Sequence, residues 1–156
     1  MKAENLMNRA VCTCSERDSL EQAARIMWDS DVGCLVVVGE EGRPIGMVTD
    51  RDLTMAAYTQ GVALRDASVS SAMSRELVKC SPETSLKDVE QPMQRHQVRR
   101  MPVMDSAGKL VGIVGLGDLA RNAQATPLHL TEVPGLAKTL ALVTQPRSRM
   151  TAVAAE

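Results

Sequence analysis

The chain has 156 residues, of which 44% are hydrophobic and 24% charged, and a formal net charge of -1. This length suits one compact domain or two small fused ones with a real hydrophobic core, and the near-neutral charge argues against broad non-specific binding to DNA or to an anionic membrane. One Trp, one Tyr and no Phe leave almost nothing on which single-stranded nucleic acid could stack.

The sequence contains an internal repeat: residues 7–53 align without a gap with residues 73–119, at an offset of 66 positions. Identical residues at this offset include Met7 and Met73, Cys14 and Cys80, Ser19 and Ser85, Met27 and Met93, Gly42 and Gly108, Gly46 and Gly112, and Asp52 and Asp118. The chain is therefore a duplicated unit followed by a tail. We place unit one at residues 5–60, a linker at 61–72, unit two at 73–123 and the tail at 124–156.

Unit one shows a regular alternation of strand and helix patterns. Ser19 and Gln22 form a capping box that opens the first helix, and the Val-rich segment after this helix favours a buried strand. The predicted elements are a short strand over 10–14, a helix over 19–29, strands over 34–38 and 44–49, and a helix from 50 to about 60.

Unit two repeats this order and then gives way to the tail. The predicted elements are a short strand over 77–80, a helix over 85–94, strands over 100–104 and 110–115, and a helix over 116–123. Pro92 lies inside the first helix, where it should kink or end it. For the tail we predict one short helix over 136–143 and otherwise partial disorder.

The predicted fold class is α/β (α+β), with tandem β-α-β-β-α repeats related by a pseudo-two-fold axis and followed by a C-terminal tail. The sequence begins with no signal pattern and has no apolar run of about 20 residues, so we expect a cytoplasmic protein that does not span a membrane.

Four cysteines occur in the chain, and in the cytoplasm their thiols are expected to stay reduced. Cys12-x-Cys14 has no second ligand pair at zinc-site spacing, so we expect no metal. The cysteines are best explained as small buried hydrophobic residues. A redox pair of Cys12 or Cys14 with Cys34 stays open as an alternative.

Thr49 and Asp52 have the chemistry of a ribose-phosphate site. Thr49 ends a strand where a helix begins, so its hydroxyl and the free backbone N–H groups there favour a phosphate. Asp52 lies one turn into the helix, and its acceptor-only oxygens suit the two vicinal hydroxyls of a ribose.

Unit two carries a reduced form of this pattern. Gly115 replaces the hydroxyl residue and Asp118 remains, while Arg99 and Arg100 add cationic donors that suit phosphate. We predict that unit one keeps the fuller motif, and that unit two either binds through Asp118 and arginine or binds nothing.

Three segments resemble a known family. Residues 45–53 (IGMVTDRDL) match its pattern of Gly, two apolar residues, Ser or Thr, two variable residues, Asp and an apolar residue; residues 111–119 (VGIVGLGDL) are the second copy, and residues 96–103 (HQVRRMPV) are typical of its second strand. With the duplicated units, the chain resembles the CBS domain pair, or Bateman module, of free-standing bacterial proteins. The resemblance covers about residues 5–123.

The resemblance implies a regulatory sensor that binds AMP, ADP, ATP or S-adenosylmethionine in the cleft between the repeats. In this family, backbone groups near the starts of the first two strands hold the base. The site residues it implies, beside those named above, are Cys12, Thr13, Gly33, Cys34 and Leu35 of unit one and Lys79, Met101 and Pro102 of unit two. It also implies a homodimer, an unknown effector protein as partner, no required cofactor and a response by population shift.

Other interpretations remain open. Thr49 or Asp50 can serve only as a helix cap, Asp52 can serve only to complement the helix dipole, and Arg99 and Arg100 can form only a solvated edge or a dimer salt bridge. The alternative function is a ligand-free dimerisation or protein-interaction module of a stress-response type.

Catalysis and nucleic-acid binding have less support. Neither of the two histidines lies in a catalytic motif. The basic cluster of Arg95, Arg99 and Arg100 lacks a motif that reads DNA. We therefore expect no enzyme activity and no nucleic-acid partner.

Overall fold

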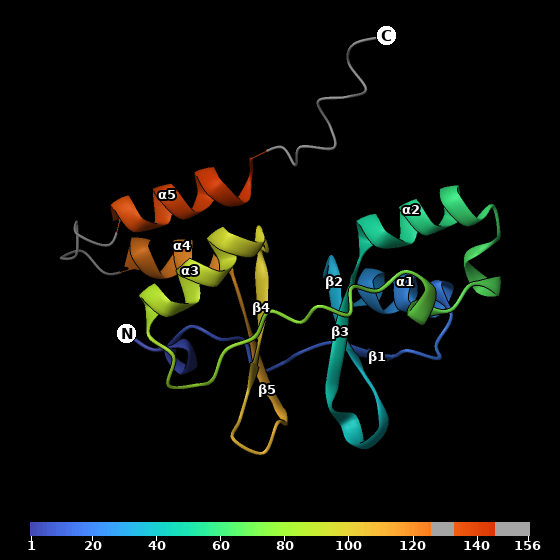
Figure 1. Cartoon of the computed structure of the whole chain (residues 1–156), viewed down its shortest axis with the longest axis horizontal. Helices are drawn as coiled ribbons and strands as arrows, with labels where there is room; N and C mark the ends of the chain where they lie inside the picture. The colour runs from blue at the N-terminus through green and yellow to red at the C-terminus, as the bar shows by residue number, and fades with distance from the viewer. Residues whose placement is uncertain (126–132, 146–156) are drawn as a thin grey trace, which may run out of the picture.

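Two sheets lie at the centre of the molecule, with helices on both outer sides (Figure 1). The structure is a computed structural model that describes residues 1–125 and 133–145. α1 and α2 flank the sheet of unit one, and α3, α4 and α5 flank the sheet of unit two. The layered, mixed α+β architecture confirms the predicted fold class.

Unit one follows the predicted order of elements. They are β1 (Thr13–Ser15), α1 (Leu20–Asp29), β2 (Cys34–Val38), β3 (Pro44–Thr49) and α2 (Asp50–Gln60). β1 runs parallel to β2, which pairs antiparallel with β3. Both central strands and α2 have the predicted bounds, whereas β1 begins three residues later than predicted. Ser19 caps α1 by accepting a hydrogen bond from the backbone of Gln22, as its position in the sequence predicted.

Unit two repeats the helices and two of the strands. Its elements are α3 (Leu86–His96), β4 (Arg100–Met104), β5 (Leu110–Gly115) and α4 (Leu116–Ala125). The predicted strand over 77–80 is reduced to one isolated bridge between Cys80 and Val103. In unit one the backbone N–H of Val36 donates to the carbonyl of Cys12. Pro102 holds the equivalent position in unit two and has no N–H to donate, so the third strand does not form.

α3 does not end at Pro92 or at the predicted bound of residue 94, because it runs through Pro92 to His96. Proline removes the bond to the carbonyl of Asp88 and disfavours a helix interior by about 3 kcal/mol. Val89 and Met93 on either side are fully buried in the core of unit two. Burial of each such side chain contributes about 1.5–3 kcal/mol, which outweighs the local cost.

A fifth helix, α5 (Val133–Val143), forms part of the tail and packs on α3 and α4. It begins three residues before the predicted helix and ends where predicted. Thr139 and Val143 are buried against unit two, and the side-chain amide of Gln94 donates to the hydroxyl of Thr139 at 2.8 Å. The disorder predicted for the rest of the tail concerns residues that include 126–132 and 146–156, which lie outside the described residues.

The two units exchange the short segments that precede their first strands. Residues 1–8 pair with unit two, where Asn8 and Ile113 share two backbone hydrogen bonds of 2.9 Å and Ala3 is buried in the core. Residues 67–74 pack on unit one in the same way, with Val69 buried in its core and Ser74 paired with Met47. The predicted linker over 61–72 is therefore partly a core segment of unit one.

Two glycines make this exchange possible. A Cβ added to Gly46 would lie 2.4 Å from the carbonyl oxygen of Ser74, and one added to Gly112 would lie 2.5 Å from the sulfur of Met7. The exchanged segments thus approach β3 and β5 so closely that a side chain on either glycine would collide with them.

No helix among residues 1–125 and 133–145 is long and apolar enough to cross a membrane.

Candidate functional site

The amino end of α2 is organised by a reciprocal cap between Thr49 and Asp52. The backbone N–H and the hydroxyl of Thr49 both donate to Asp52 Oδ2, at 2.8 and 2.7 Å. The backbone N–H of Asp52 in turn donates to the Thr49 hydroxyl at 3.3 Å. Both side chains are half-buried. The capping role that the sequence left open is therefore real, and it also fixes the position and orientation of both groups.

The amino end of α4 repeats the acidic half of this arrangement. Asp118 Oδ2 accepts a hydrogen bond of 2.7 Å from the backbone of Gly115, as Asp52 does from Thr49. The other carboxylate oxygen of Asp118, Oδ1, forms an ion pair with Arg121. Unit two thus retains the aspartate of the motif, Asp118, and one oxygen of this side chain is engaged in an ion pair within α4.

Cys34 and Arg100, which are equivalent positions in the two units, meet between them. Each is the first residue of its strand, and Arg100 lies close enough to the Cys34 thiol to oppose the rise in its pKa that burial causes. Cys34 is paired with Thr49, and Arg100 with Gly115. This proximity therefore places the amino ends of α2 and α4 at the same edge of the molecule.

The residues just before β2 and β4 make equivalent backbone hydrogen bonds at this edge. The carbonyl of Gly33 accepts from the backbone of Asp50 at 3.2 Å, and the carbonyl of Arg99 accepts from Leu116 at 3.0 Å. A Cβ on Gly33 would lie 3.2 Å from a carboxylate oxygen of Asp50, so a larger residue would push that carboxylate aside.

The remaining predicted site residues fall into two groups. Leu35 and Met101 are fully buried in the two cores, so only their backbones can face a ligand. Cys12 directly precedes β1 and Thr13 begins it; both are half-buried beside Val36 of β2. In unit two, Lys79 is exposed and Pro102 is buried.

Asp50 is a site residue that the sequence offered only as a helix cap. Its carboxylate lies against Gly33 and close enough to Cys34 to affect the titration of that thiol. No motif marks it, and only the tertiary contact between β2 and the start of α2 reveals its place. Arg121 was likewise missed, although its i,i+3 spacing from Asp118 is visible in the sequence.

The thiols of Cys14, Cys34 and Cys80 are poor nucleophiles. Burial raises the pKa of Cys34, Asp50 and Cys12 raise it further, and Arg100 opposes this without reversing it. Burial also raises the pKa of Cys14 to about 12 and that of Cys80 to about 11. All four cysteines are free. The raised pKa values agree with a packing role, because a reactive cysteine needs a lowered one.

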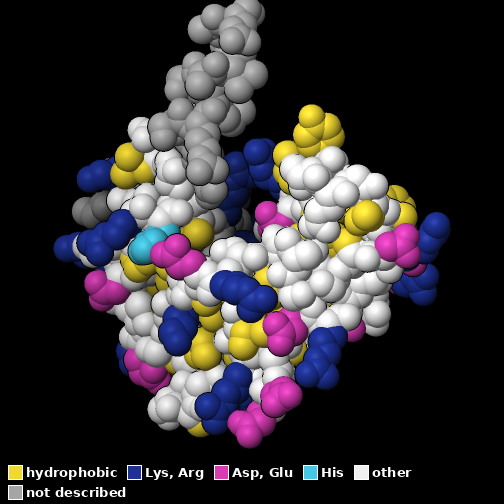
Figure 2. Space-filling view, turned by 45° about the vertical axis from the view of Figure 1, so that its right-hand side comes forward, with side chains coloured by type: hydrophobic (Ala, Val, Ile, Leu, Met, Phe, Trp, Pro, Cys, Tyr) yellow, Lys and Arg dark blue, Asp and Glu magenta, His cyan; other side chains and the backbone are white. Residues whose placement is uncertain are grey.

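Charged groups border a hollow between the two halves of the molecule. Figure 2 shows dark blue Lys or Arg side chains and a magenta Asp or Glu side chain around it. No group of three or more His, Cys, Asp or Glu side chains in the described part of the chain is arranged to hold a metal ion. The chemical groups at this edge are the backbone N–H groups at the starts of α2 and α4, the carboxylates of Asp50, Asp52 and Asp118, and the guanidinium groups of Arg99, Arg100 and Arg121.

The fold and the paired edges define a duplicated two-unit α+β protein. A family model of the CBS domain matches residues 3–58 and again residues 69–125. The chain therefore belongs to the CBS-domain family and contains two copies of the domain, as its sequence motifs indicated.

Known relatives cover most of the chain. CBS domain-containing protein YhcV of Bacillus subtilis is 44% identical over 121 residues, which are 76% of this chain and 83% of that protein. Hypoxic response protein 1 of Mycobacterium tuberculosis is 33% identical over 120 residues, 77% of this chain and 83% of that protein.

Solved structures share the same fold. A crystal structure of Hypoxic Response Protein I with two coordinated zinc ions matches with a TM-score of 0.71 and 32% identity, over 78% of this chain and 98% of that one. A crystal structure of CBSX2 in complex with AMP matches with a TM-score of 0.69 and 23% identity, over 80% of this chain and 96% of that one. At 23% identity the second likeness shows the fold alone.

Proposed function

We propose that this chain is a regulatory module that binds an adenine nucleotide or adenosyl ligand, namely AMP, ADP, ATP or S-adenosylmethionine, at the edge between its two units. CBS-domain proteins are generally regulatory rather than catalytic. The observation that carries the proposal is the contact of Cys34 with Arg100, which brings the Thr49–Asp52 cap and the Gly115–Asp118 cap to one edge. The structure of CBSX2 with AMP supports the choice of ligand class.

The residues at this edge have complementary roles toward such a ligand. The Asp52 carboxylate, held by Thr49, has lone pairs left to accept from ribose hydroxyls. Arg99 and Arg100 are exposed and can bind phosphate, and the amino ends of α2 and α4 add favourable dipoles. Backbone groups of Cys12, Gly33 and the equivalent residues of unit two would read the base.

Phosphate-bearing ligands are the first to test because the arginines favour anions. A ligand that bridges both units would favour one relative arrangement of them, and this shift in population would be the signal to an effector protein. We expect a homodimer. We expect the module to require no cofactor or metal, to bind no nucleic acid and to catalyse no reaction. Its cytoplasmic location stays a prediction from the sequence.

The test is a thermal-shift series with AMP, ADP, ATP and S-adenosylmethionine, followed by calorimetric titration. A ligand at about 100 times its dissociation constant stabilises the folded state by about 2.7 kcal/mol. Loss of one charged hydrogen-bond partner, as in Asp52→Asn or Asp118→Asn, should weaken binding by about tenfold or more. Whichever variant has the larger effect identifies the occupied unit.

Asp88→Asn is the matched control. Asp88 caps α3 with Ser85 through the same pair of side-chain and backbone hydrogen bonds, but α3 begins next to the segment that pairs with residues 1–4 and not at the edge between the units. It should lower stability like the other variants and leave affinity unchanged. If no ligand stabilises the folded wild type, the proposal fails and the ligand-free interaction module replaces it.

A further inference from the structure

The two ends of the edge differ in charge although they occupy equivalent positions in the two units. At the unit-one end, residues 33–34 and 49–55 include one arginine and two aspartates, namely Arg51, Asp50 and Asp52. The equivalent residues 99–100 and 115–121 of unit two include three arginines and one aspartate, namely Arg99, Arg100, Arg121 and Asp118. The unit-two end therefore carries a net charge of +2 and the unit-one end a net charge of -1, so an anion is drawn to unit two.

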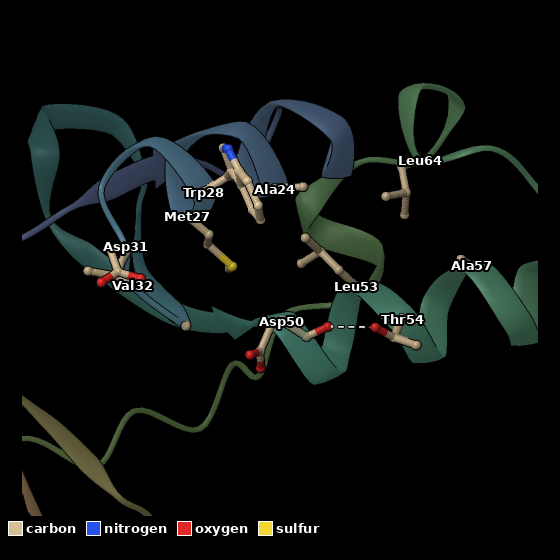
Figure 3. A pocket seen from close by; sticks show the side chains of 11 residues that line it. Ala24, Met27, Trp28, Asp31, Val32, Asp50, Leu53, Thr54, Ala57 and Leu64 are labelled. Atoms are coloured by element: carbon tan, nitrogen blue, oxygen red, sulfur yellow. Dashed lines mark hydrogen bonds between the residues drawn. The ribbon is translucent and has the colours of Figure 1, made fainter.

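The acid at the start of α2 has no counterpart at the start of α4. Asp50 is the first residue of α2, where its backbone carbonyl accepts a hydrogen bond of 3.0 Å from the Thr54 hydroxyl (Figure 3). Its carboxylate lies beside Gly33 at the edge. Leu116, which is buried, holds the equivalent position in unit two. A negative charge that repels a phosphate is thus present at one helix start and absent from the other.

Arg121 lies back over the first turn of α4. Its guanidinium pairs with Asp118 Oδ1, and a Cβ on Gly117 would lie 3.3 Å from one of its nitrogens. Unit one has Arg51 in place of Gly117 and Met55 in place of Arg121, so no arginine stands at the equivalent position of unit one. The Arg121 side chain is 74% exposed, and an ion pair so exposed contributes little to stability and exchanges readily for another partner.

Arg100 approaches the same helix start from β4. It is paired with Gly115, and a Cβ on Gly115 would lie 3.6 Å from Arg100 Cγ. Because Gly115 has no hydroxyl, the cap bond that Thr49 accepts from the Asp52 N–H has no counterpart at Asp118. That N–H and the two guanidinium groups are donors for a phosphate, which guanidinium groups bind by charge-assisted and often bidentate hydrogen bonds.

We propose that Arg121 and Arg100 make the unit-two end of the edge selective for phosphate-bearing nucleotides, with Arg121 exchanging Asp118 for the phosphate when AMP, ADP or ATP binds. Asp118 Oδ1 is then free to accept from a ribose hydroxyl, while Gly115 still holds Oδ2. S-adenosylmethionine has a sulfonium and an ammonium group instead of a phosphate, so this end excludes it. The selectivity rests on the proposed function, because the ligand must bind at this edge, and it narrows the ligand class to nucleoside phosphates.

Calorimetric titration of the full chain with AMP, adenosine and S-adenosylmethionine tests this selectivity, since adenosine shares the base and ribose of AMP and lacks its phosphate. AMP should bind about a hundredfold more tightly than adenosine, and S-adenosylmethionine no more tightly than adenosine. The preference for AMP over adenosine should shrink as sodium chloride is added, because salt screens the exposed arginines. Arg121→Met introduces the residue that unit one has at this position and should reduce the preference about tenfold.

Arg51→Met is the matched control, because it removes the same charge from the first turn of α2 at the unit-one end. It should leave the preference for AMP within about twofold of the wild type. Arg121→Lys keeps the charge without the planar guanidinium and should retain part of the preference.

Two kinds of failure are distinguishable. S-adenosylmethionine that binds as tightly as AMP overturns the selectivity while the proposed function stands. An equal loss of AMP and adenosine affinity in Arg121→Met does the same, as does a larger loss of preference in Arg51→Met than in Arg121→Met. If none of the ligands binds the folded chain, the proposed function fails and the selectivity fails with it.

Discussion

Units one and two share the same framework but differ in three places. Both bury a helix pair against a sheet, and both carry a glycine where the exchanged segment crosses the last strand. Unit two loses the first strand at Pro102, replaces the cap hydroxyl by Gly115 and gains α5. The framework residues determine packing, so both copies keep them, whereas the differences lie at the edge between the units and on the outer helical face.

The first prediction tests whether the two glycines are equally necessary. Gly46→Ala places a Cβ against the backbone carbonyl of Ser74, which can move only with its chain, whereas Gly112→Ala meets the flexible side chain of Met7. We expect losses of about 2–3 kcal/mol for Gly46→Ala and about 1 kcal/mol for Gly112→Ala in urea unfolding. Equal losses in the free energy of unfolding would show that the segments around Ser74 and Met7 adjust to the added methyl group equally well.

The second prediction concerns the buried thiols of the two cores. Unfolded cysteine titrates near its ordinary pKa of 9.0, whereas Cys14 and Cys80 titrate at about 12 and about 11 in the folded chain. Because both folded pKa values are raised, their contribution is fully present below pH 9. It falls as the pH rises toward 11–12, by about 1.4 kcal/mol per pH unit for each thiol.

Urea unfolding between pH 8 and pH 10.5 measures this slope. Cys14→Ala and Cys80→Ala should each remove about one thiol's share of the slope, in addition to a constant loss from the cavity that they leave. A slope unchanged in Cys14→Ala would show that its thiol ionises as easily in the folded chain as in the unfolded one.

The third prediction exchanges the caps of the two units. Thr49→Ala removes the hydroxyl that caps α2 and should cost about 1 kcal/mol. Gly115→Thr gives α4 the same cap and should gain about 0.5 kcal/mol. Its Cβ would lie 3.3 Å from Asp118 Oδ2, so the carboxylate must shift slightly. Thermal unfolding of both variants is the measurement, and destabilisation by Gly115→Thr would show that the second edge has no room for a hydroxyl.

Much of the fold was predictable because its signals are local. The strands over 34–38, 44–49, 100–104 and 110–115 have the predicted bounds, since Val-rich runs and Gly-containing turns mark them in both copies. The capping of α1 and α2 followed from Ser19 and Thr49 for the same reason. Pro92 misled the prediction because helix propensity is a local cost, and burial of its neighbours outweighed it.

The candidate site was predictable in its motif but not in its assembly. Thr49, Asp52 and Asp118 are visible in the sequence because the repeat aligns them. The approach of Cys34 to Arg100 and the place of Asp50 depend on how the sheets face each other, and no sequence spacing contains that information. The role of these residues in ligand binding stays a prediction.

The sequence by itself determined the duplication, the order of elements and the motif at the start of α2, because each depends on residues close together in the chain. Only the tertiary structure decided that the units exchange their leading segments and that α5 packs on the helices of unit two. These features depend on contacts between residues far apart in the chain, where a small difference in packing selects one arrangement among several that satisfy the same local pattern.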